Sequence, residues 1–212
     1  MRAVEERRDF SADALLRTNI RATVVAAQTD PDGDDWGSTN TFTYPEDVPD
    51  GVLDATYLEV SRDDSTTYVR VEFTTLAPND PTLVAVAFDL EDGGERRVGR
   101  NALFDFPEDA GYEFVVFLGD GIEIENARGQ SVGALSGTSA FDAAGGVLEF
   151  AIPNVVMPTV SRGDKIFVLV GPNDGSNAFR DVRRTASGNT GGGKVSESAP
   201  NVYDFIVGTV TQ

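Results

Sequence analysis

Hydrophobic and polar residues alternate along much of this chain with the period of β-strands. In the run Tyr68–Phe73, Val69, Val71 and Phe73 alternate with polar partners, which indicates a strand with one face in a core and one in solvent. The runs Leu83–Phe88 and Phe114–Leu118 are continuously apolar and indicate central strands that are covered on both faces.

Clusters of Gly, Pro, Asp and Asn separate the β-rich runs, as they do in sandwiches. The sequence Gly119-Asp120-Gly121 supplies a tight hairpin turn between two of the runs. We therefore predict an all-β fold, a single antiparallel β-sandwich of jelly-roll or immunoglobulin-like type. The predicted strands are Ile20–Ala27, Ala55–Ser61, Thr67–Leu76, Thr82–Asp89, Tyr112–Leu118, Ile122–Ala127, Val147–Ile152, Lys165–Gly171 and Val202–Val210.

The first 19 residues carry a different pattern from the rest of the chain. Arg, Glu, Ala and Leu recur there at loosely helical spacing, and Ser11 is placed to cap a short run, Ala12–Arg17. We interpret residues 1–19 as a linker or short helix and residues 20–212 as one sandwich domain. Near the end, the Gly- and Ser-rich stretch Thr185–Ala199 predicts a long mobile loop.

Charge narrows the choice of partners. The chain has 35 Asp and Glu against 17 Lys and Arg, and only Lys165 and Lys194 are lysines. Such a surface repels phosphate backbones and anionic lipid headgroups, which argues against nucleic acid and direct membrane insertion. Many carboxylates with few lysines favour a protein of concentrated salt, and hence a halophilic, haloarchaeal source. An ordinary acidic extracellular domain is the alternative.

The absence of His and Cys removes most catalytic machinery. Ser-His-Asp and Cys-His catalysis, His-ligated zinc or haem and disulfides are all excluded. Paired carboxylates alone give no positive support for an enzyme, so we predict a noncatalytic domain. No window approaches 18 apolar residues, and Met1–Asp13 is too charged for a signal peptide. If the domain is extracellular or on the cell surface, we expect its signal on a longer parent chain.

An Asp-rich stretch, residues 30–36, is the strongest candidate for chemistry. It places Asp30, Asp32, Asp34 and Asp35 within six residues, with a glycine between them. Ca²⁺ needs six to eight oxygen ligands, which such a loop supplies in part. The EF-hand pattern fails because Thr41 occupies its twelfth position. We predict a calcium site. Two acidic residues at strand ends are possible distant ligands: Asp54 and Asp89. A solvated acidic turn is the alternative.

Aromatic residues follow this stretch directly. Trp36, the only tryptophan, and Tyr44 are flanked by small polar residues, so we predict partial exposure and a role in carbohydrate binding. Core packing is the better interpretation of Phe42. In the C-terminal third, a buried ion pair between Asp174 and Arg180 is predicted to hold a loop, while the helix and Gly-Lys-Ser/Thr ending of a phosphate site are lacking.

Several of these segments, taken together, resemble the glucodextranase C-terminal domain family. The resemblance rests on Asp30–Gly37, Thr41–Pro45, Leu53-Asp54 and Tyr57–Val60, then on the loop Asn173–Val182, the run Gly191–Gly193 and Pro200–Phe205, which includes Asp204. It spans about residue 30 to the C-terminus. The resemblance implies a DOMON-like sandwich, related to family 9 carbohydrate-binding modules, with structural calcium. Asp174, Arg180 and Asp204 are expected to have a structural role in loops.

The function that the resemblance implies is polysaccharide binding or cell-surface attachment, in an exported amylolytic enzyme or surface protein. Haem binding, as in some DOMON relatives, needs His and Met ligands, and here His is absent and Met157 is the sole internal methionine. The paired tryptophans of family 9 modules are also absent. The competing interpretation is a structural surface-layer or filament domain that contacts other domains or proteins and no sugar.

Overall fold

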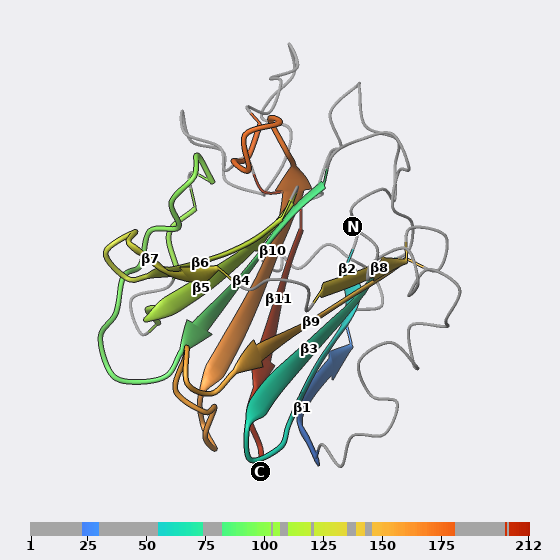
Figure 1. The fold of residues 1–212 in the computed structure, drawn as a ribbon, viewed down its shortest axis with the longest axis vertical. Helices are drawn as coiled ribbons and strands as arrows, with labels where there is room; N and C mark the ends of the chain where they lie inside the picture. Colours follow the sequence, from blue (N-terminus) through green and yellow to red (C-terminus); the bar gives the residue numbers. More distant parts are fainter. Residues whose placement is uncertain are drawn as a thin grey trace, which may run out of the picture.

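The computed structural model describes residues 23–29, 55–73, 82–102, 104–106, 110–119, 121–134, 139–142, 146–180, 202 and 204–212. Within these ranges the chain forms eleven β-strands and no helix (Figure 1). The strands are β1 (Thr23–Thr29), β2 (Ala55–Arg62), β3 (Thr66–Phe73), β4 (Thr82–Asp89), β5 (Phe114–Leu118), β6 (Ile122–Asn126), β7 (Ser131–Ala134), β8 (Ser139–Asp142), β9 (Val147–Pro153), β10 (Lys165–Pro172) and β11 (Asp204–Thr209).

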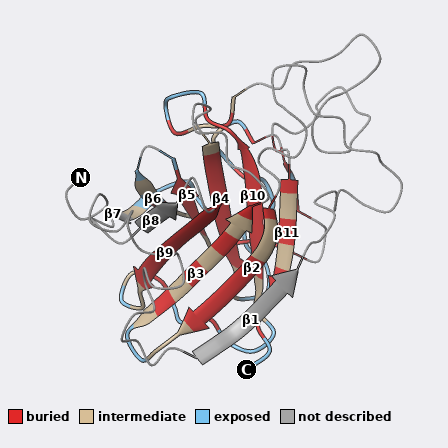
Figure 2. Cartoon of the chain, turned by 90° about the vertical axis from the view of Figure 1, so that its right-hand side faces the viewer, coloured by how far each residue is buried: buried red, intermediate tan, exposed pale blue. Residues whose placement is uncertain are grey.

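The strands form two antiparallel sheets that pack face to face. One sheet has five strands in the order β1-β2-β3-β9-β8, and the other has six in the order β11-β10-β4-β5-β6-β7. In Figure 2 the five-stranded sheet lies in front of the six-stranded sheet. The prediction of an all-β antiparallel sandwich is therefore confirmed.

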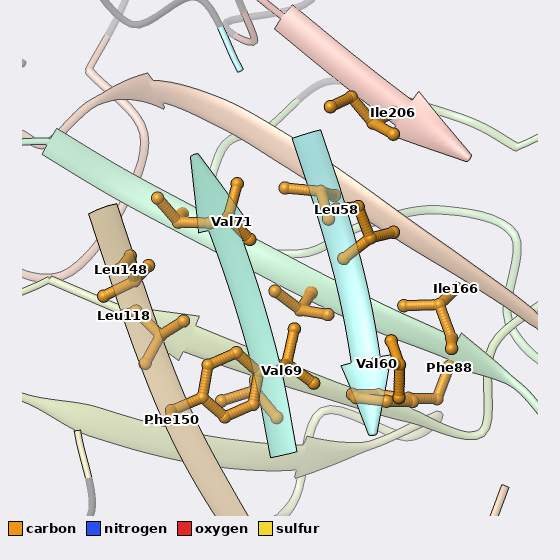
Figure 3. Packing of buried hydrophobic residues seen from close by; sticks show 14 of the residues in the cluster. Leu58, Val60, Val69, Val71, Phe88, Leu118, Leu148, Phe150, Ile166 and Ile206 are labelled. Carbon is orange, nitrogen blue, oxygen red and sulfur yellow. The ribbon is translucent and has the colours of Figure 1, made fainter. Parts of the chain in front are cut away.

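The core between the sheets consists of the inward side chains of both (Figure 3). Leu58, Val69 and Phe150 of the five-stranded sheet face Phe88 and Ile166 of the six-stranded sheet. Along β3, buried and half-buried residues alternate, as the alternating sequence predicts. Successive residues of a strand therefore lie on opposite faces of the sheet, one facing the core and the next facing outward.

A second apolar layer covers the outer face of the six-stranded sheet. In β4, Leu83, Ala85 and Ala87 point away from the main core, and they pack with residues of the irregular segment 95–112. There Phe106 contacts Phe104, Tyr112 and Phe167, with ring centroids 5.1, 5.9 and 4.4 Å away. Burial raises the pKa of Tyr112 to about 12. This layer explains why β4 is apolar at every position from 83 to 88, on its outer face as well as on its inner face.

The observed strand bounds agree with the sequence prediction at most elements. The prediction for β4 has the observed bounds, and β2, β9 and β10 differ by one residue at the C-terminal end. Gly119 N donates to Gly121 O at 3.1 Å in the predicted hairpin between β5 and β6. The strands β7 and β8, of four residues each, were not predicted. The predicted helical run Ala12–Arg17 and the loop Thr185–Ala199 lie outside the described residues.

Candidate functional site

One end of the sandwich, here called the loop end, collects the strand ends that flank the long connections. Pairing of Ala55 with Phe73, and of Pro172 with Thr82, aligns these ends within each sheet. In Figure 1 the loop after β10 lies at the top, at this end. The strand termini at the loop end are Thr29, Ala55, Phe73, Thr82, Leu118, Pro172 and Asp204.

Of the residues predicted to hold calcium and sugar, all but Asp89 lie outside the described residues; these are Asp30, Asp32, Asp34, Asp35, Asp54, Trp36 and Tyr44. Their roles stay predictions. What the structure gives is where the flanking strands end: Asp30 directly follows Thr29 of β1, and Asp54 directly precedes Ala55 of β2. Because Thr29 pairs with Tyr57, two residues from Ala55, both carboxylates are joined to strands at the loop end.

Asp204 joins the two sheets at this end. Its side chain is fully buried, and Oδ2 accepts a hydrogen bond from the backbone N of Ala55 at 2.5 Å. Oδ1 accepts from the backbone N of Phe205 at 2.7 Å. Since Ala55 belongs to the five-stranded sheet and Asp204 to the six-stranded sheet, this carboxylate fixes the start of β2 against β11.

Asp89, in contrast, lies at the opposite end of the sandwich. It is the last residue of β4 and pairs with Lys165, whereas Val84 of the same strand is level with Val170 and, through it, with Asp204. Five residues of strand correspond to roughly 16 Å. Ligands of one Ca²⁺ lie about 2.3–2.6 Å from the ion, so Asp89 cannot complete a site that includes Asp54. We remove it from the predicted ligand set.

The predicted buried ion pair of Asp174 with Arg180 is wrong in its burial, because the Asp174 carboxylate is exposed. Its Oδ1 instead closes a local turn, where it accepts hydrogen bonds from Ser176 N and Ser176 Oγ, both at 2.7 Å. These bonds lower the pKa of Asp174. Arg180 is half-buried, and its backbone N donates to Pro172 O at 2.8 Å.

Two buried asparagines organise the same loop. Asn173 and Asn177 are 2% and 6% exposed. Asn173 Oδ1 accepts from Gly175 N at 2.9 Å and from Asn177 N at 3.2 Å, and Asn177 Nδ2 donates to Glu123 Oε1 at 3.0 Å. Asn177 adopts a left-handed backbone with φ of 61°. Asparagine is one of the few non-glycine residues that tolerate this conformation, which favours it at this turn.

A second loop is bound to the first by Arg100. Its guanidinium donates to Glu123 at 2.5 Å, to Glu125 at 2.5 and 2.9 Å and to Asn177 O at 2.9 Å. It also stacks over the ring of Phe117, with its central carbon 4.4 Å from the ring centroid. Burial would lower the pKa of Arg100, but the bonds to the two glutamates raise it above the ordinary value. Hydrogen bonding to Arg100 in turn lowers the pKa of Glu123.

Backbone contacts complete this connection. Phe179 N donates to Arg100 O at 2.8 Å, and Asn101 Nδ2 donates to Phe179 O at 3.0 Å. Arg100 and Asn101 both have positive φ, 52° and 61°. Two successive non-glycine residues with positive φ cost conformational energy, and this backbone persists because the surrounding hydrogen bonds hold it. We call residues 99–102 and 173–179 the latched loop pair.

Gly119 packs directly against the latched loop pair. A Cβ atom at this position would collide with Asn177 Oδ1 and Asn173 Nδ2. Among the described residues, neither of these two buried amide atoms has a hydrogen-bond partner. The hairpin turn at Gly119 and the loop after β10 are therefore fitted to each other with no room for a larger side chain.

The opposite end carries an open hollow of about 620 Å³, here called the acidic pocket. It is lined by residues 89–94, Arg96, Ala110, Gly111 and residues 163–165. Glu113 holds its wall, because Oε2 accepts from Leu90 N at 2.7 Å. Burial raises the pKa of Glu113 and that of Asp164.

In the described ranges, no three acidic side chains gather in a group that could hold a metal ion. No helix that could span a membrane was found in these ranges either.

These features define a class: an antiparallel β-sandwich whose polar residues rigidify loops at its ends. A family model described as the C-terminal binding module, SLH-like, of glucodextranase matches residues 25–212, and the chain therefore belongs to this family. The resemblance seen in the sequence is thus confirmed. A comparison with curated proteins gave no match.

Proposed function

We propose that this domain is a noncatalytic module that holds an exported parent protein on a polysaccharide or a cell-surface glycan. The observation that carries the proposal is the convergence of strand ends at the loop end, in a chain of the glucodextranase binding-module family. Connections 30–54 and 181–203 both start and finish there. The latched loop pair and Asp204 fix the strand ends to which these connections are joined, and a fixed attachment favours binding because less ordering is needed.

We propose further that the carboxylates of Asp30, Asp32, Asp34 and Asp35 bind a structural Ca²⁺ and that Asp54 adds a ligand. Two observations support the proposal. Hard oxygen donors occur at short spacing, and the strand before them, β1, ends at the same end of the sandwich at which the strand after them, β2, begins. The ion would fix the segment that carries Trp36, whose ring would then meet the sugar face together with Tyr44.

The glycan proposal is tested by co-sedimentation of the full chain with insoluble starch and with insoluble cell-wall glycan. We expect retention on at least one polymer and loss of retention in Trp36→Ala and Tyr44→Ala. The matched control is Val155→Ala, because Val155 is 94% exposed and follows β9 at the opposite end. Retention on neither polymer would contradict the proposal. Concentration-dependent self-association in sedimentation velocity would then favour a structural surface protein.

The calcium proposal is tested by thermal unfolding after chelation, at high background salt so that general screening is already saturated. A ligand that binds only the folded state raises Tm according to its concentration and affinity. We expect Ca²⁺ to raise Tm in the wild type and not in Asp32→Ala, whereas Asp89→Ala should keep the full shift. An identical response of Asp32→Ala and wild type would remove the site.

The charge of −18 also leads us to propose that the domain works outside the cell in concentrated salt. Unfolding free energy should then rise steeply with NaCl and level off above the concentration at which surface repulsion is screened.

A further inference from the structure

Two Asp-Gly pairs lie in exposed turns of the described ranges. Asp92-Gly93 follows β4 in the wall of the acidic pocket, and Asp174-Gly175 follows β10 at the loop end. All of these residues are exposed, and both glycines have positive φ, 114° at Gly93 and 86° at Gly175. A Cβ atom at either glycine would have nothing within 4 Å. The two pairs therefore match in sequence, exposure, backbone region and free space.

An Asp-Gly pair can rearrange its own backbone. The glycine nitrogen attacks the side-chain carboxyl carbon of the aspartate, a C–N bond forms, and the carboxyl hydroxyl leaves as water with the amide proton. Glycine favours this cyclisation because it has no side chain beside its nitrogen and because its backbone is permissive. The product is a succinimide, a five-membered ring that includes the main chain.

Water then opens the succinimide ring at one of its two carbonyl carbons. Opening at the former side-chain carbon restores aspartate. Opening at the main-chain carbon breaks the original peptide bond, so that the chain continues through the β-carboxyl group and the residue becomes isoaspartate. The water that was released is taken up again, and the net change is an isomerisation with no oxidant or other reagent.

At the loop end, both reacting groups of the Asp-Gly pair are held by hydrogen bonds. The nucleophile, Gly175 N, donates to Asn173 Oδ1 at 2.9 Å. The Asp174 Oδ1 atom accepts from Ser176 N and Ser176 Oγ, both at 2.7 Å, and from Ala178 N at 3.3 Å. These bonds lower the pKa of Asp174 and so disfavour the neutral carboxyl group, which is the form that loses water. Cyclisation here requires several hydrogen bonds to break first.

At the acidic pocket, neither reacting group is held. Within the described ranges, the Asp92 carboxylate accepts no hydrogen bond and the Gly93 amide donates none. The paired backbone begins only two residues further on, where Glu95 N donates to Tyr112 O at 3.0 Å and Tyr112 N donates to Glu95 O at 2.9 Å. The nitrogen and the carboxyl group of this pair can therefore meet without the loss of a hydrogen bond.

The product would change the wall of the acidic pocket. Gly93 and Gly111 both line this pocket, and a Cβ atom on Gly111 would collide with Gly93 O. An isoaspartyl linkage adds one methylene group to the main chain directly before Gly93. Because the two glycine backbones are in such close contact, the longer chain must displace one of them, while the loop end is unaffected.

We propose that Asp92 is a site of spontaneous isomerisation to isoaspartate and that the hydrogen bonds of the loop after β10 protect Asp174 from the same reaction. This inference does not depend on the proposed binding of glycan or calcium. The fold, and not the local sequence, then decides which of the two pairs is modified.

Incubation of the full chain in heavy-oxygen water at mildly acidic pH tests the proposal, because each succinimide that opens takes up one heavy oxygen atom. Trypsin, used afterwards in ordinary water, places the two pairs in separate peptides, 71–96 and 166–180. Electron-transfer fragmentation then distinguishes isoaspartate from aspartate at each position. We expect isoaspartate to form roughly fivefold faster or more at Asp92 than at Asp174, where hydrogen bonds must first break. Equal rates, or a faster reaction at Asp174, would overturn the proposal.

Three controls separate the effect of the fold from that of the sequence. In concentrated urea the hydrogen bonds are lost, so the two rates should become similar; a difference that persisted there would refute the role of the fold. Asn173→Ala removes the acceptor of Gly175 N and should speed the reaction at Asp174, while an unchanged rate at Asp92 shows that the fold is intact. No acceleration at Asp174 would refute the protection. Asp92→Glu should abolish heavy-oxygen uptake at position 92, because glutamate does not form the five-membered ring.

Discussion

The latched loop pair and the acidic pocket lie at opposite ends of one sandwich and treat their carboxylates in opposite ways. Beside the latched loop pair, Glu123 of β6 accepts hydrogen bonds from Arg100 and Asn177, and its pKa falls. At the acidic pocket, burial is the largest influence on Glu113 and Asp164, and their pKa values rise. The first end uses charge to fix loops, and the second tolerates charge that would be more stable in water.

This difference bears on which end is fit for binding. A loop that is fixed by several charge-assisted bonds presents neighbouring segments in one arrangement, and this lowers the entropic cost of binding. The acidic pocket has glycines on its walls, such as Gly93 and Gly163 with φ of 114° and 100°. The Glu113 carboxylate, which holds the wall of this pocket, is buried at the expense of its charged form. We therefore propose the loop end, and not the acidic pocket, as the end that binds.

The largest expected effect comes from removing the guanidinium that holds the latched loop pair. Arg100→Leu leaves Glu125 and the carbonyl of Asn177 without their donor, so we expect a loss of roughly 2–4 kcal/mol in unfolding free energy. Arg100→Lys keeps the charge but loses the planar fork, and about half of that loss is expected. Urea unfolding measures both, and a loss below about 0.5 kcal/mol in Arg100→Leu would show that the latch is not stabilising.

A smaller effect is expected from filling the contact at Gly119. Gly119→Ala drives a methyl group into the amides of Asn173 and Asn177, which should cost about 1–3 kcal/mol and weaken glycan retention. Gly121→Ala is the matched control, since a Cβ atom there has nothing within 4 Å. Equal stability of the two variants in urea would mean that the hairpin turn and the loop are not fitted to each other.

The smallest effect concerns pH at the acidic pocket. Because burial raises the pKa of Glu113, the folded protein takes up this proton before the unfolded chain does. The resulting stabilisation is complete below the ordinary carboxyl pKa and is lost as pH rises through the raised value. In Glu113→Gln this contribution should vanish from the unfolding free energy measured between pH 4 and 7. A pH profile parallel to that of the wild type would refute the assignment.

The fold could be predicted from the sequence because the alternation of apolar and polar residues along a strand, and the presence of continuous apolar runs, directly reflect which faces of the strand are buried. The continuous run Leu83–Phe88 indicates cover on both faces, and the structure supplies both. The strands β7 and β8 were missed because four residues are too few to establish a period, and Gly133 interrupts the first. The outer layer 95–112 was missed because Val98, Phe104 and Phe106 are spaced irregularly, as befits irregular backbone.

The candidate site could be predicted less well. The Asn173-Asp174-Gly175 turn is visible in the sequence, but the pairing of Asp174 with Arg180 ignored that a short Asp side chain satisfies nearby backbone N–H groups first. Arg100 has no signal in the sequence, because its role depends on a left-handed backbone and on partners 23 to 77 residues away. Asp89 and Asp54 are far apart along the chain, so the sequence alone could not show that Asp89 lies at the opposite end of the sandwich from the strand that Asp54 precedes.

Hydrogen–deuterium exchange of the full chain, with and without soluble amylose or solubilised cell-wall glycan, tests the proposal that the domain binds glycan at the loop end. We expect slower exchange in 30–54 and 181–203 and at the amides of Asn177 and Ala178, with no change at residues 89–94 and 163–165. Protection confined to residues 89–94 and 163–165 would contradict it and assign binding to the acidic pocket.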